Sequence, residues 1–210
     1  ISVFNISNDL QYIPISLFGI SFATAVFPSL SRNFSRAKAS LSQVKKEKEK
    51  FLKKFTSTFS QILFFTLPLS VLFFLLRAQI VRIIPGSENY TWQDTRLTAA
   101  CLGLFTFSIF AQSLIPLLAK SFYSFQDTKT PVKISIFSII FNIIFCFLFV
   151  WLLSSPGSFY YFLQSFLKLE GISQISVIGL PLAFSLSSIL NLIWLLFMFK
   201  KKTGNGWDLR

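Results

Sequence analysis

Five long stretches without a charged residue constrain this chain more than any other feature of its sequence. They cover residues 10–31, 55–76, 97–119, 134–153 and 171–199. A helix needs about 20 apolar residues to cross the hydrocarbon core of a bilayer, and each stretch reaches that length. Backbone groups inside lipid must be hydrogen-bonded within their own segment, so these stretches are predicted to be helices. They lack the period-two alternation that is typical of the strands of a membrane β-barrel.

These stretches predict an all-α fold, namely a polytopic transmembrane helix bundle with about five spanning helices. Hydrophobic residues make up 53% of the 210 residues and charged residues only 13%, against roughly 25% charged in a typical soluble domain. A soluble domain of this length could not bury so much apolar surface. We place the spans at about residues 10–31, 55–81, 97–119, 132–153 and 175–199, within a single transmembrane domain fragment over residues 1–210.

Basic residues are concentrated in alternate connections between the spans. Residues 32–54 contain nine Lys and Arg, residues 120–133 contain three, and residues 200–210 contain four. The other two connections, with their bordering arginines, contain three in total. Because cytoplasmic loops of membrane proteins are enriched in Lys and Arg, the three basic connections are predicted to be cytoplasmic. The net charge of +12 is thus a signal of topology and does not predict nucleic-acid binding.

Residues 37–54 combine this basic charge with a partial apolar stripe. Leu41, Val44, Phe51 and Phe55 recur at roughly helical spacing, and lysines fill much of the other face. Such a helix can lie on the inner leaflet, where each Lys gains about 1 kcal/mol from anionic lipid. We expect either a basic cytoplasmic amphipathic segment here or a solvated basic loop.

The residue types that carry catalysis or bind metals are sparse. The chain has no His, and its two cysteines, Cys101 and Cys146, lie inside apolar runs. It contains no glycine-rich phosphate loop and no nucleophile beside a base. We therefore expect no enzyme activity, no metal site and no cofactor. A membrane glycosyltransferase would need acidic loops at the membrane surface, and the outer loop offers only Glu88 and Asp94.

Polar residues in or beside the spans each allow a functional and a structural interpretation. Asn8, Asp9 and Gln11 form a patch at the outer end of the first span. They either line an aqueous substrate cavity or cap a helix at the interface. A charge at the bilayer centre costs about 3 kcal/mol, so a charged group in a span needs a partner or water. Interhelical hydrogen bonds explain Asn142 and Asn191, in the fourth and fifth spans.

Prolines fall inside four of the predicted spans: Pro14, Pro68, Pro116 and Pro181. They predict either kinks that neighbouring helices tolerate or bends that open a cavity. Pro131 differs because it suits the first turn of the fourth span, where its missing N–H has no helical partner to lose. We expect Thr128 or Thr130 to supply the N-cap of that helix.

Two segments carry a more specific signal. The first has the pattern P-x-x-x-F-G-x-x-x-x-T-x-x-x-P-x-L-S from Pro14 to Ser31, and the second reads F-Y-S-F-Q-D-T-K-T-P-V-K from Phe122 to Lys133. Both resemble stretches of the MurJ/MviN family of lipid II flippases, which belongs to the MOP superfamily. The resemblance covers nearly the whole chain. It implies a partial MOP-type transporter, with these spans as the eighth to twelfth of fourteen helices.

The resemblance also implies a function. The chain would be part of a flippase that moves the undecaprenyl-linked peptidoglycan precursor across the bacterial cytoplasmic (inner) membrane by alternating access. Its partners would be membrane lipids, this lipid-linked precursor and the missing N-terminal half of the same protein. The second segment would form a cytoplasmic gate or loop, with the candidate residues Gln126, Asp127, Thr128, Lys129 and Pro131. The alternatives are another MOP-type exporter, of lipid-linked oligosaccharide or drug, and a non-transporting membrane scaffold.

The chain departs from the family at Asp9. Members often carry an Arg and then an acid shortly before the first proline of the pattern. Counting back from Pro14, Asp9 occupies the place of the Arg and Tyr12 the place of the acid. An anionic pyrophosphate requires a cation or several hydrogen-bond donors when it loses water. We therefore expect Asp9 either to pair with a basic residue of the missing half or to face the outer interface.

Overall fold

The computed structural model describes residues 2–39, 44–83, 92–154, 157–167 and 175–204, and the described residues contain helices and no strands. In chain order the elements are α1 (Ser2–Pro14), the π-helix η1 (Ile15–Ile20), α2 (Ser21–Ala39), α3 (Val44–Leu75), α4 (Arg77–Ile83), α5 (Trp92–Ser124), α6 (Lys129–Ser154), α7 (Ser158–Leu167), the 3₁₀-helix η2 (Ile175–Ile178) and α8 (Gly179–Thr203). Five helical stretches are long and apolar enough to cross a bilayer. The predicted all-α membrane fold is therefore confirmed.

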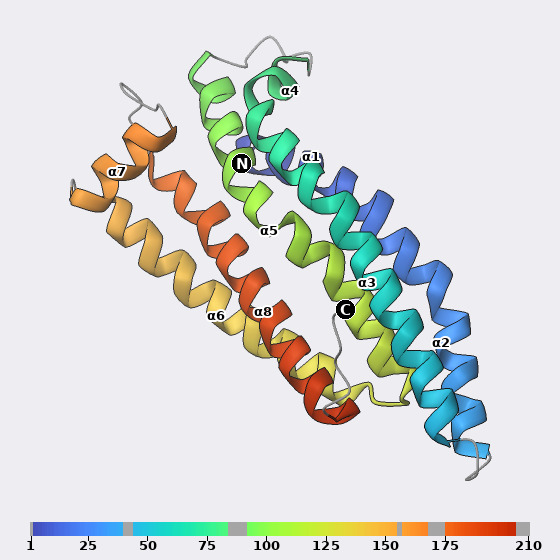
Figure 1. The fold of residues 1–210 in the computed structure, drawn as a ribbon. Helices are drawn as coiled ribbons and strands as arrows, with labels where there is room; N and C mark the ends of the chain where they lie inside the picture. Colours follow the sequence, from blue (N-terminus) through green and yellow to red (C-terminus); the bar gives the residue numbers. More distant parts are fainter. Residues whose placement is uncertain (1, 40–43, 84–91, 155–156, 168–174, 205–210) are drawn as a thin grey trace.

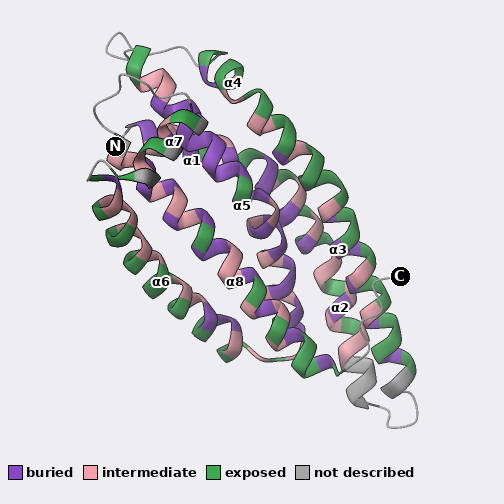
Figure 2. Ribbon diagram, turned by 60° about the vertical axis from the view of Figure 1, so that its left-hand side comes forward, coloured by how far each residue is buried: buried purple, intermediate pink, exposed green. Residues whose placement is uncertain are grey.

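Helix α5 forms the centre of the bundle, as Figure 1 shows. The continuous helix made by α1, η1 and α2 packs with α3 on one side of α5, and α8 packs on the other side. Helix α6 is outermost and lies along α8. Within its most apolar window, 72% of α5 is buried, against 6% of α6. Figure 2 shows the same contrast between the two helices.

The exposed surface of α6 is almost wholly apolar. Its large exposed side chains are Val132, Ile136, Phe137, Ile139, Ile140, Phe141, Ile143, Ile144, Phe147, Leu148 and Trp151. A soluble monomer rarely exposes an apolar patch of this extent. In a bilayer the same side chains contact acyl chains or other helices at no cost, so this surface fits a helix that faces lipid or the rest of a larger protein.

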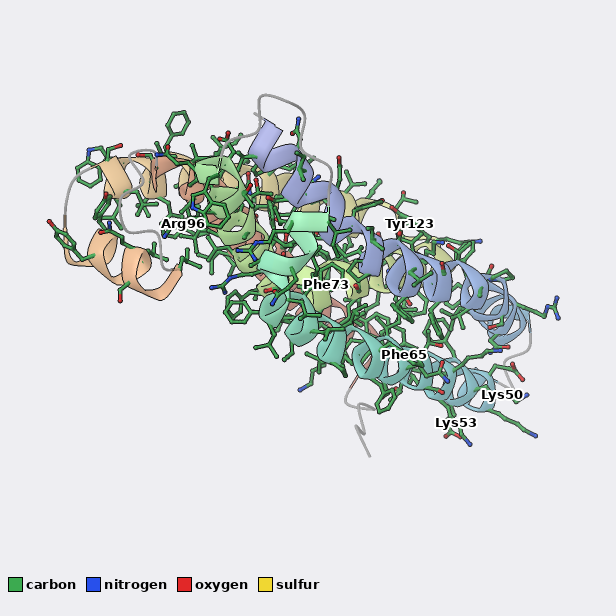
Figure 3. The ribbon with its side chains drawn as sticks, turned by 90° about the horizontal axis from the view of Figure 1, so that it is seen from above. Lys50, Lys53, Phe65, Phe73, Arg96 and Tyr123 are labelled. Carbon is green, nitrogen blue, oxygen red and sulfur yellow. The ribbon has the colours of Figure 1, made fainter. Side chains whose placement is uncertain are left out.

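The helix ends are sorted by charge. The ends of α2, α5 and α8 and the starts of α3 and α6 lie together, at the lower end of Figure 1. We call this the basic end, because α3 begins with several lysines and Lys200, Lys201 and Lys202 lie in the last turn of α8. Figure 3 shows Lys50 and Lys53 projecting outward from the start of α3. Which side of the membrane this end faces stays a prediction, as do the exact limits of the spans.

A cluster of aromatic rings fills the core at the basic end. Phe55 of α3 stacks on Phe199 of α8 with 4.4 Å between ring centroids, and Phe122 of α5 meets Phe199 edge to face at 5.9 Å. All three side chains are fully buried. Aromatic pairs stabilise by roughly 0.5–1.5 kcal/mol beyond their burial. The cluster therefore ties three helices together at this end.

The first predicted span is not a uniform α-helix, because η1 interrupts it directly after Pro14. Ser21 shows the wider turn: its backbone N–H points to the carbonyl of Ser16, five residues back, and its hydroxyl donates to the same oxygen at 3.0 Å. Gly19 lies in this turn, against α5. A Cβ atom there would lie 2.6 Å from the Cα of Ser113, so only glycine allows this approach.

Two further predicted elements differ from, or lie partly outside, what the structure describes. The second span, predicted as one run at residues 55–81, is divided, because α3 ends at Leu75 and α4 begins at Arg77. Of the predicted amphipathic segment at residues 37–54, residues 40–43 lie outside the described residues, and so do the side chains of residues 35–45. The amphipathic character of that segment stays a prediction.

Candidate functional site

A polar network connects α1 to α5 inside the apolar bundle. Gln11, only 1% exposed, donates from Nε2 to Oδ1 of Asn8 at 2.9 Å. Its Oε1 accepts from Nε2 of Gln112 at 3.2 Å, and Gln112 also donates to the hydroxyl of Ser108 at 2.8 Å. Buried amides are costly unless they are hydrogen-bonded. The network therefore holds the Gln112 side chain in a defined place on α5.

Gln112 forms part of the lining of a groove of about 400 Å³. Residues from four parts of the fold line it: Tyr12, Ile15, Ile20, Gln112, Ile115, Pro116, Ser135, Ser138, Ile139, Asn142, Phe184, Ser187, Ser188 and Asn191. Its polar members lie near the middle of α5, α6 and α8. Pro116 adds a further acceptor, because a proline has no N–H and the carbonyl of Gln112 loses its usual helical donor. We call this space the polar groove.

The polar groove offers hydrogen-bonding groups and no charge. None of its lining residues is charged at neutral pH. Asn142 donates to the hydroxyl of Ser187 at 2.9 Å, and Ser138 donates to the carbonyl of Ser187 at 3.1 Å, so α6 and α8 are joined here. The Oδ1 atom of Asn191 is buried and accepts no hydrogen bond in the structure. An unpaired buried acceptor costs about 1–3 kcal/mol, so Asn191 points to a missing donor.

The structure places the three candidate substrate-cavity residues, Asn8, Asp9 and Gln11, in different surroundings. Gln11 is buried, and it is joined to the groove through Gln112. Asn8 is half-buried and joins the same network only through Gln11, from which its Oδ1 accepts a hydrogen bond. Asp9 is exposed and does not line the groove, and within the described ranges no ion pair or hydrogen bond of its carboxylate is found. Whether any of the three contacts a substrate stays a prediction.

The second candidate segment forms the turn between α5 and α6. The N–H of Asp127 donates to the carbonyl of Phe122 at 3.1 Å, and the N–H of Gln126 donates to that of Tyr123 at 2.9 Å. This pair of bonds is the Schellman motif, which ends a helix with one residue in the left-handed region. Gln126 takes that place with a φ of 59°. Its backbone therefore determines the direction in which the chain leaves α5.

Asp127 caps the next helix and is paired with a lysine from α8. Its Oδ1 accepts from the N–H of Thr130 at 3.1 Å, and its Oδ2 accepts from the Thr130 hydroxyl at 2.8 Å and from Nζ of Lys202 at 2.5 Å. The hydrogen bond from Lys202, with those from Thr130, lowers the pKa of Asp127 from 3.8 to about 2. Asp127 is therefore ionised at any physiological pH.

This geometry corrects one expectation and supports another. The prediction that Thr128 or Thr130 caps α6 is wrong, because the carboxylate of Asp127 accepts from the free N–H of Thr130. A carboxylate is the better acceptor beside the positive end of a helix. Pro131 is buried in the first turn of α6, as predicted. The side chains of Thr128 and Lys129 are exposed, and the role of this segment as a gate stays a prediction.

The sequence reasoning missed three residues that the structure makes important. Gln112 lies within the uncharged stretch at residues 97–119, and an amide in such a span is itself a signal. The sequence predicts an interhelical hydrogen bond for Asn191, and its Oδ1 atom accepts none in the structure. Lys202 is one of four basic residues at positions 200–210, and charge counting alone does not single out the one that pairs with Asp127.

The described residues contain no group of three or more His, Cys, Asp or Glu side chains that could hold a metal ion. The lining of the polar groove offers hydrogen bonds from uncharged side chains.

Comparison with known proteins identifies a family. Residues 1–208 match the family model described as lipid II flippase MurJ. A protein named "Probable lipid II flippase MurJ" from Buchnera aphidicola subsp. Schizaphis graminum is 30% identical over 157 residues, which are 75% of this chain and 27% of that protein. A protein with the same description from Rickettsia prowazekii is 31% identical over 141 residues, which are 67% of this chain and 26% of that protein.

A solved structure has the same fold. It is described as lipid II flippase MurJ in an inward closed conformation, and it matches with a TM-score of 0.69 at 23% identity. The match covers 95% of this chain but 36% of that structure. The chain spans about a quarter of the length of the curated relatives it matches.

Proposed function

Because the chain belongs to the lipid II flippase MurJ family, we propose that it forms one wall of the substrate cavity of a lipid II flippase. The complete protein would move the undecaprenyl-linked precursor across the bacterial cytoplasmic membrane. The chain would work with the rest of that protein by alternating access, in which two lobes rock around a central site. The family match favours this function over another exporter, a scaffold or an enzyme.

The observation that carries the proposal is the uncharged polar groove. A sugar or peptide headgroup presents many hydroxyls and amides, and the groove offers Gln112, Asn142 and Asn191 at the middle of three helices. It offers no cation for a pyrophosphate. We therefore assign the uncharged part of the headgroup to this groove and the pyrophosphate to cations in the rest of the protein.

The test replaces Asn191 with leucine, which has a similar volume and is apolar. Oδ1 of Asn191 has no hydrogen-bond partner in the structure, so Asn191→Leu should leave the unfolding temperature unchanged or raise it. In the full-length protein we expect transport of the lipid-linked precursor to fall by about five- to 150-fold, since a lost hydrogen bond in a buried site is worth about 1–3 kcal/mol.

Ser121→Ala is the matched control, because its buried hydroxyl donates only to the carbonyl of Leu117 in its own helix, at 2.8 Å, and lies outside the groove. It should transport normally. Lower stability of the full-length Asn191→Leu protein, with normal transport per folded molecule, would show that Asn191 bonds to another helix instead of substrate. Normal transport at normal stability would remove the groove from the proposed site.

A further inference from the structure

A second pocket lies at the basic end of the bundle, away from the polar groove. Its volume is about 210 Å³, and it is lined by Asn33, Phe34, Glu47, Lys48, Phe51, Phe125, Lys202 and Thr203. This is smaller than the roughly 300–1,000 Å³ of sites for drug-sized ligands, so its occupant is a small group. The residues come from α2, α3, the α5–α6 turn and the end of α8.

Glu47 is the unusual member of this lining. The residue is only 4% exposed, although a carboxylate is almost never buried without full pairing. Its Oε1 accepts from Nζ of Lys50 at 2.6 Å, and that lysine is itself 52% exposed. Its Oε2 is buried and has no hydrogen-bond partner in the structure. The free oxygen calls for an N–H donor, and a cationic one matches its charge.

The aromatic wall of the pocket also suits a cation. Phe34 and Phe51 both pack on Phe125, with centroids 5.2 and 4.9 Å apart. The ring of Phe125 already faces one ammonium group, that of Lys202, at 5.6 Å. Aromatic faces attract ammonium groups within about 6 Å. The same wall is therefore compatible with a second ammonium group on the Glu47 side.

A simple cation would nevertheless meet repulsion from the lysines around the pocket. Lys202 is paired with Asp127. Lys48 is exposed, and its ammonium group lies near Gly204, since a Cβ placed on that glycine would be 3.9 Å from Nζ. A simple anion would meet the buried carboxylate of Glu47. A ligand with an ammonium group close to a phosphate satisfies both, because the ammonium can bond to Glu47 while the phosphate meets Lys48.

We propose that this pocket binds the phosphoethanolamine headgroup of a membrane phospholipid. Its position at the end of the spanning helices, beside the lysines of α3, is where headgroups of the adjoining leaflet lie. The acyl chains would then extend along the exposed apolar side chains of the bundle, while the headgroup fills the small pocket. This assignment does not depend on the transport of any substrate.

The experiment measures lipid binding to the purified full-length protein in detergent by native mass spectrometry. The probes are phosphatidylethanolamine, phosphatidylcholine and phosphatidylglycerol with the same acyl chains. We expect phosphatidylethanolamine to bind about tenfold more tightly than phosphatidylglycerol, as one charged hydrogen bond allows. Phosphatidylcholine should fall between them, because its ammonium can face the rings but has no N–H for Glu47.

Two variants make the test specific. Glu47→Gln should abolish the preference for phosphatidylethanolamine, whereas Glu49→Gln, the same change at an exposed residue two positions away, should leave it intact. Lys48→Gln should weaken binding of phosphatidylethanolamine several-fold by removing the contact with its phosphate. An equal preference in the Glu47→Gln and Glu49→Gln proteins would overturn the proposal. Soluble phosphoethanolamine that competes at the same concentration as the lipid would overturn the assignment to a lipid.

Discussion

At the scale of single residues, the close packing of the first helix against α5 depends on Gly19. The π-turn of η1 brings this glycine against the backbone of α5 at Ser113. Small residues at such crossings let membrane helices pack closely, because packing rather than the hydrophobic effect holds helices together in lipid. The preceding Pro14 cannot donate a backbone hydrogen bond, which favours an irregular helix at this point.

We predict that Gly19→Ala destabilises the protein. The added Cβ would lie 2.6 Å from the Cα and 2.7 Å from the carbonyl oxygen of Ser113, and a backbone cannot move aside without separating the helices. We expect the free energy of unfolding to fall by about 1–3 kcal/mol, although alanine is the better helix former. Unfolding of the purified protein by SDS or heat measures the effect.

Gly103→Ala is the control for this prediction. A Cβ at Gly103 would meet the Cδ of Arg77 at 3.0 Å, and this flexible side chain can shift. The control should therefore change the unfolding free energy by less than about 0.5 kcal/mol. Equal losses in the two variants would mean that the crossing at Ser113 is not unusually tight.

At the scale of elements, the α5–α6 turn is held by its own backbone and by α8. The Schellman motif ends α5, Asp127 starts α6, and Lys202 connects both to the last turn of α8. Three elements that are separate in the sequence thus meet at one carboxylate. A movement of α8 away from this turn beyond the reach of the Lys202 side chain would break the ion pair. The role of the turn as a gate stays a prediction.

We predict a graded loss of stability at Asp127. Asp127→Asn can still accept from the N–H of Thr130 but loses the ion pair, which at such a partly exposed site is worth about 0.2–1 kcal/mol. Asp127→Ala also loses the cap and should cost about 0.5–2 kcal/mol more. Thermal unfolding of the purified proteins measures the expected order of stability: parent, then Asp127→Asn, then Asp127→Ala. Gln126→Gly is the control, because glycine adopts a positive φ without strain and should keep or raise stability.

The pH dependence of this effect has a definite sign. The pKa of Asp127 is lowered from 3.8 to about 2, so its contribution to stability is complete above pH 4 and is lost as the pH falls toward 2. The difference between the parent protein and Asp127→Asn should therefore stay constant from pH 5 to 8. A difference that changes within that interval would show that another group controls the turn.

At the scale of the whole molecule, the sorting of charge predicts how the bundle crosses the membrane. The basic end should face the cytoplasm, because lysines there contact anionic lipid and are retained on that side. The opposite end carries α7 and the start of α5 (Figure 1). The charge distribution favours this orientation, which stays a prediction.

We predict opposite accessibility for cysteines placed at the two ends. In full-length protein with Cys101→Ala and Cys146→Ala, Lys53→Cys at the basic end should resist a membrane-impermeant thiol reagent added to intact cells. Tyr161→Cys in α7 should react, since both residues have exposed side chains. Permeabilised cells provide the control, where both should react. Reaction of Lys53→Cys in intact cells would reverse the predicted topology.

The sequence by itself determined the class of fold, the number of spanning helices and the grouping of basic residues. It could do so because the bilayer acts on each segment separately, through length and hydropathy. Motifs of the two family segments likewise predicted the turn at Pro131. These properties depend on residues close together in the chain, so no knowledge of packing was needed.

Only the tertiary structure decided which helices lie inside and where the polar site forms. Hydropathy is misleading here: α6 has the highest mean hydropathy, 2.7, and is the least buried span, whereas α5, with 1.8, is the most buried. In lipid, apolar side chains gain nothing from being inside, so hydropathy does not rank burial. The groove at Asn191, the approach of Gly19 to Ser113 and the pairing of Asp127 with Lys202 all join residues far apart in the sequence, and only packing brings them together.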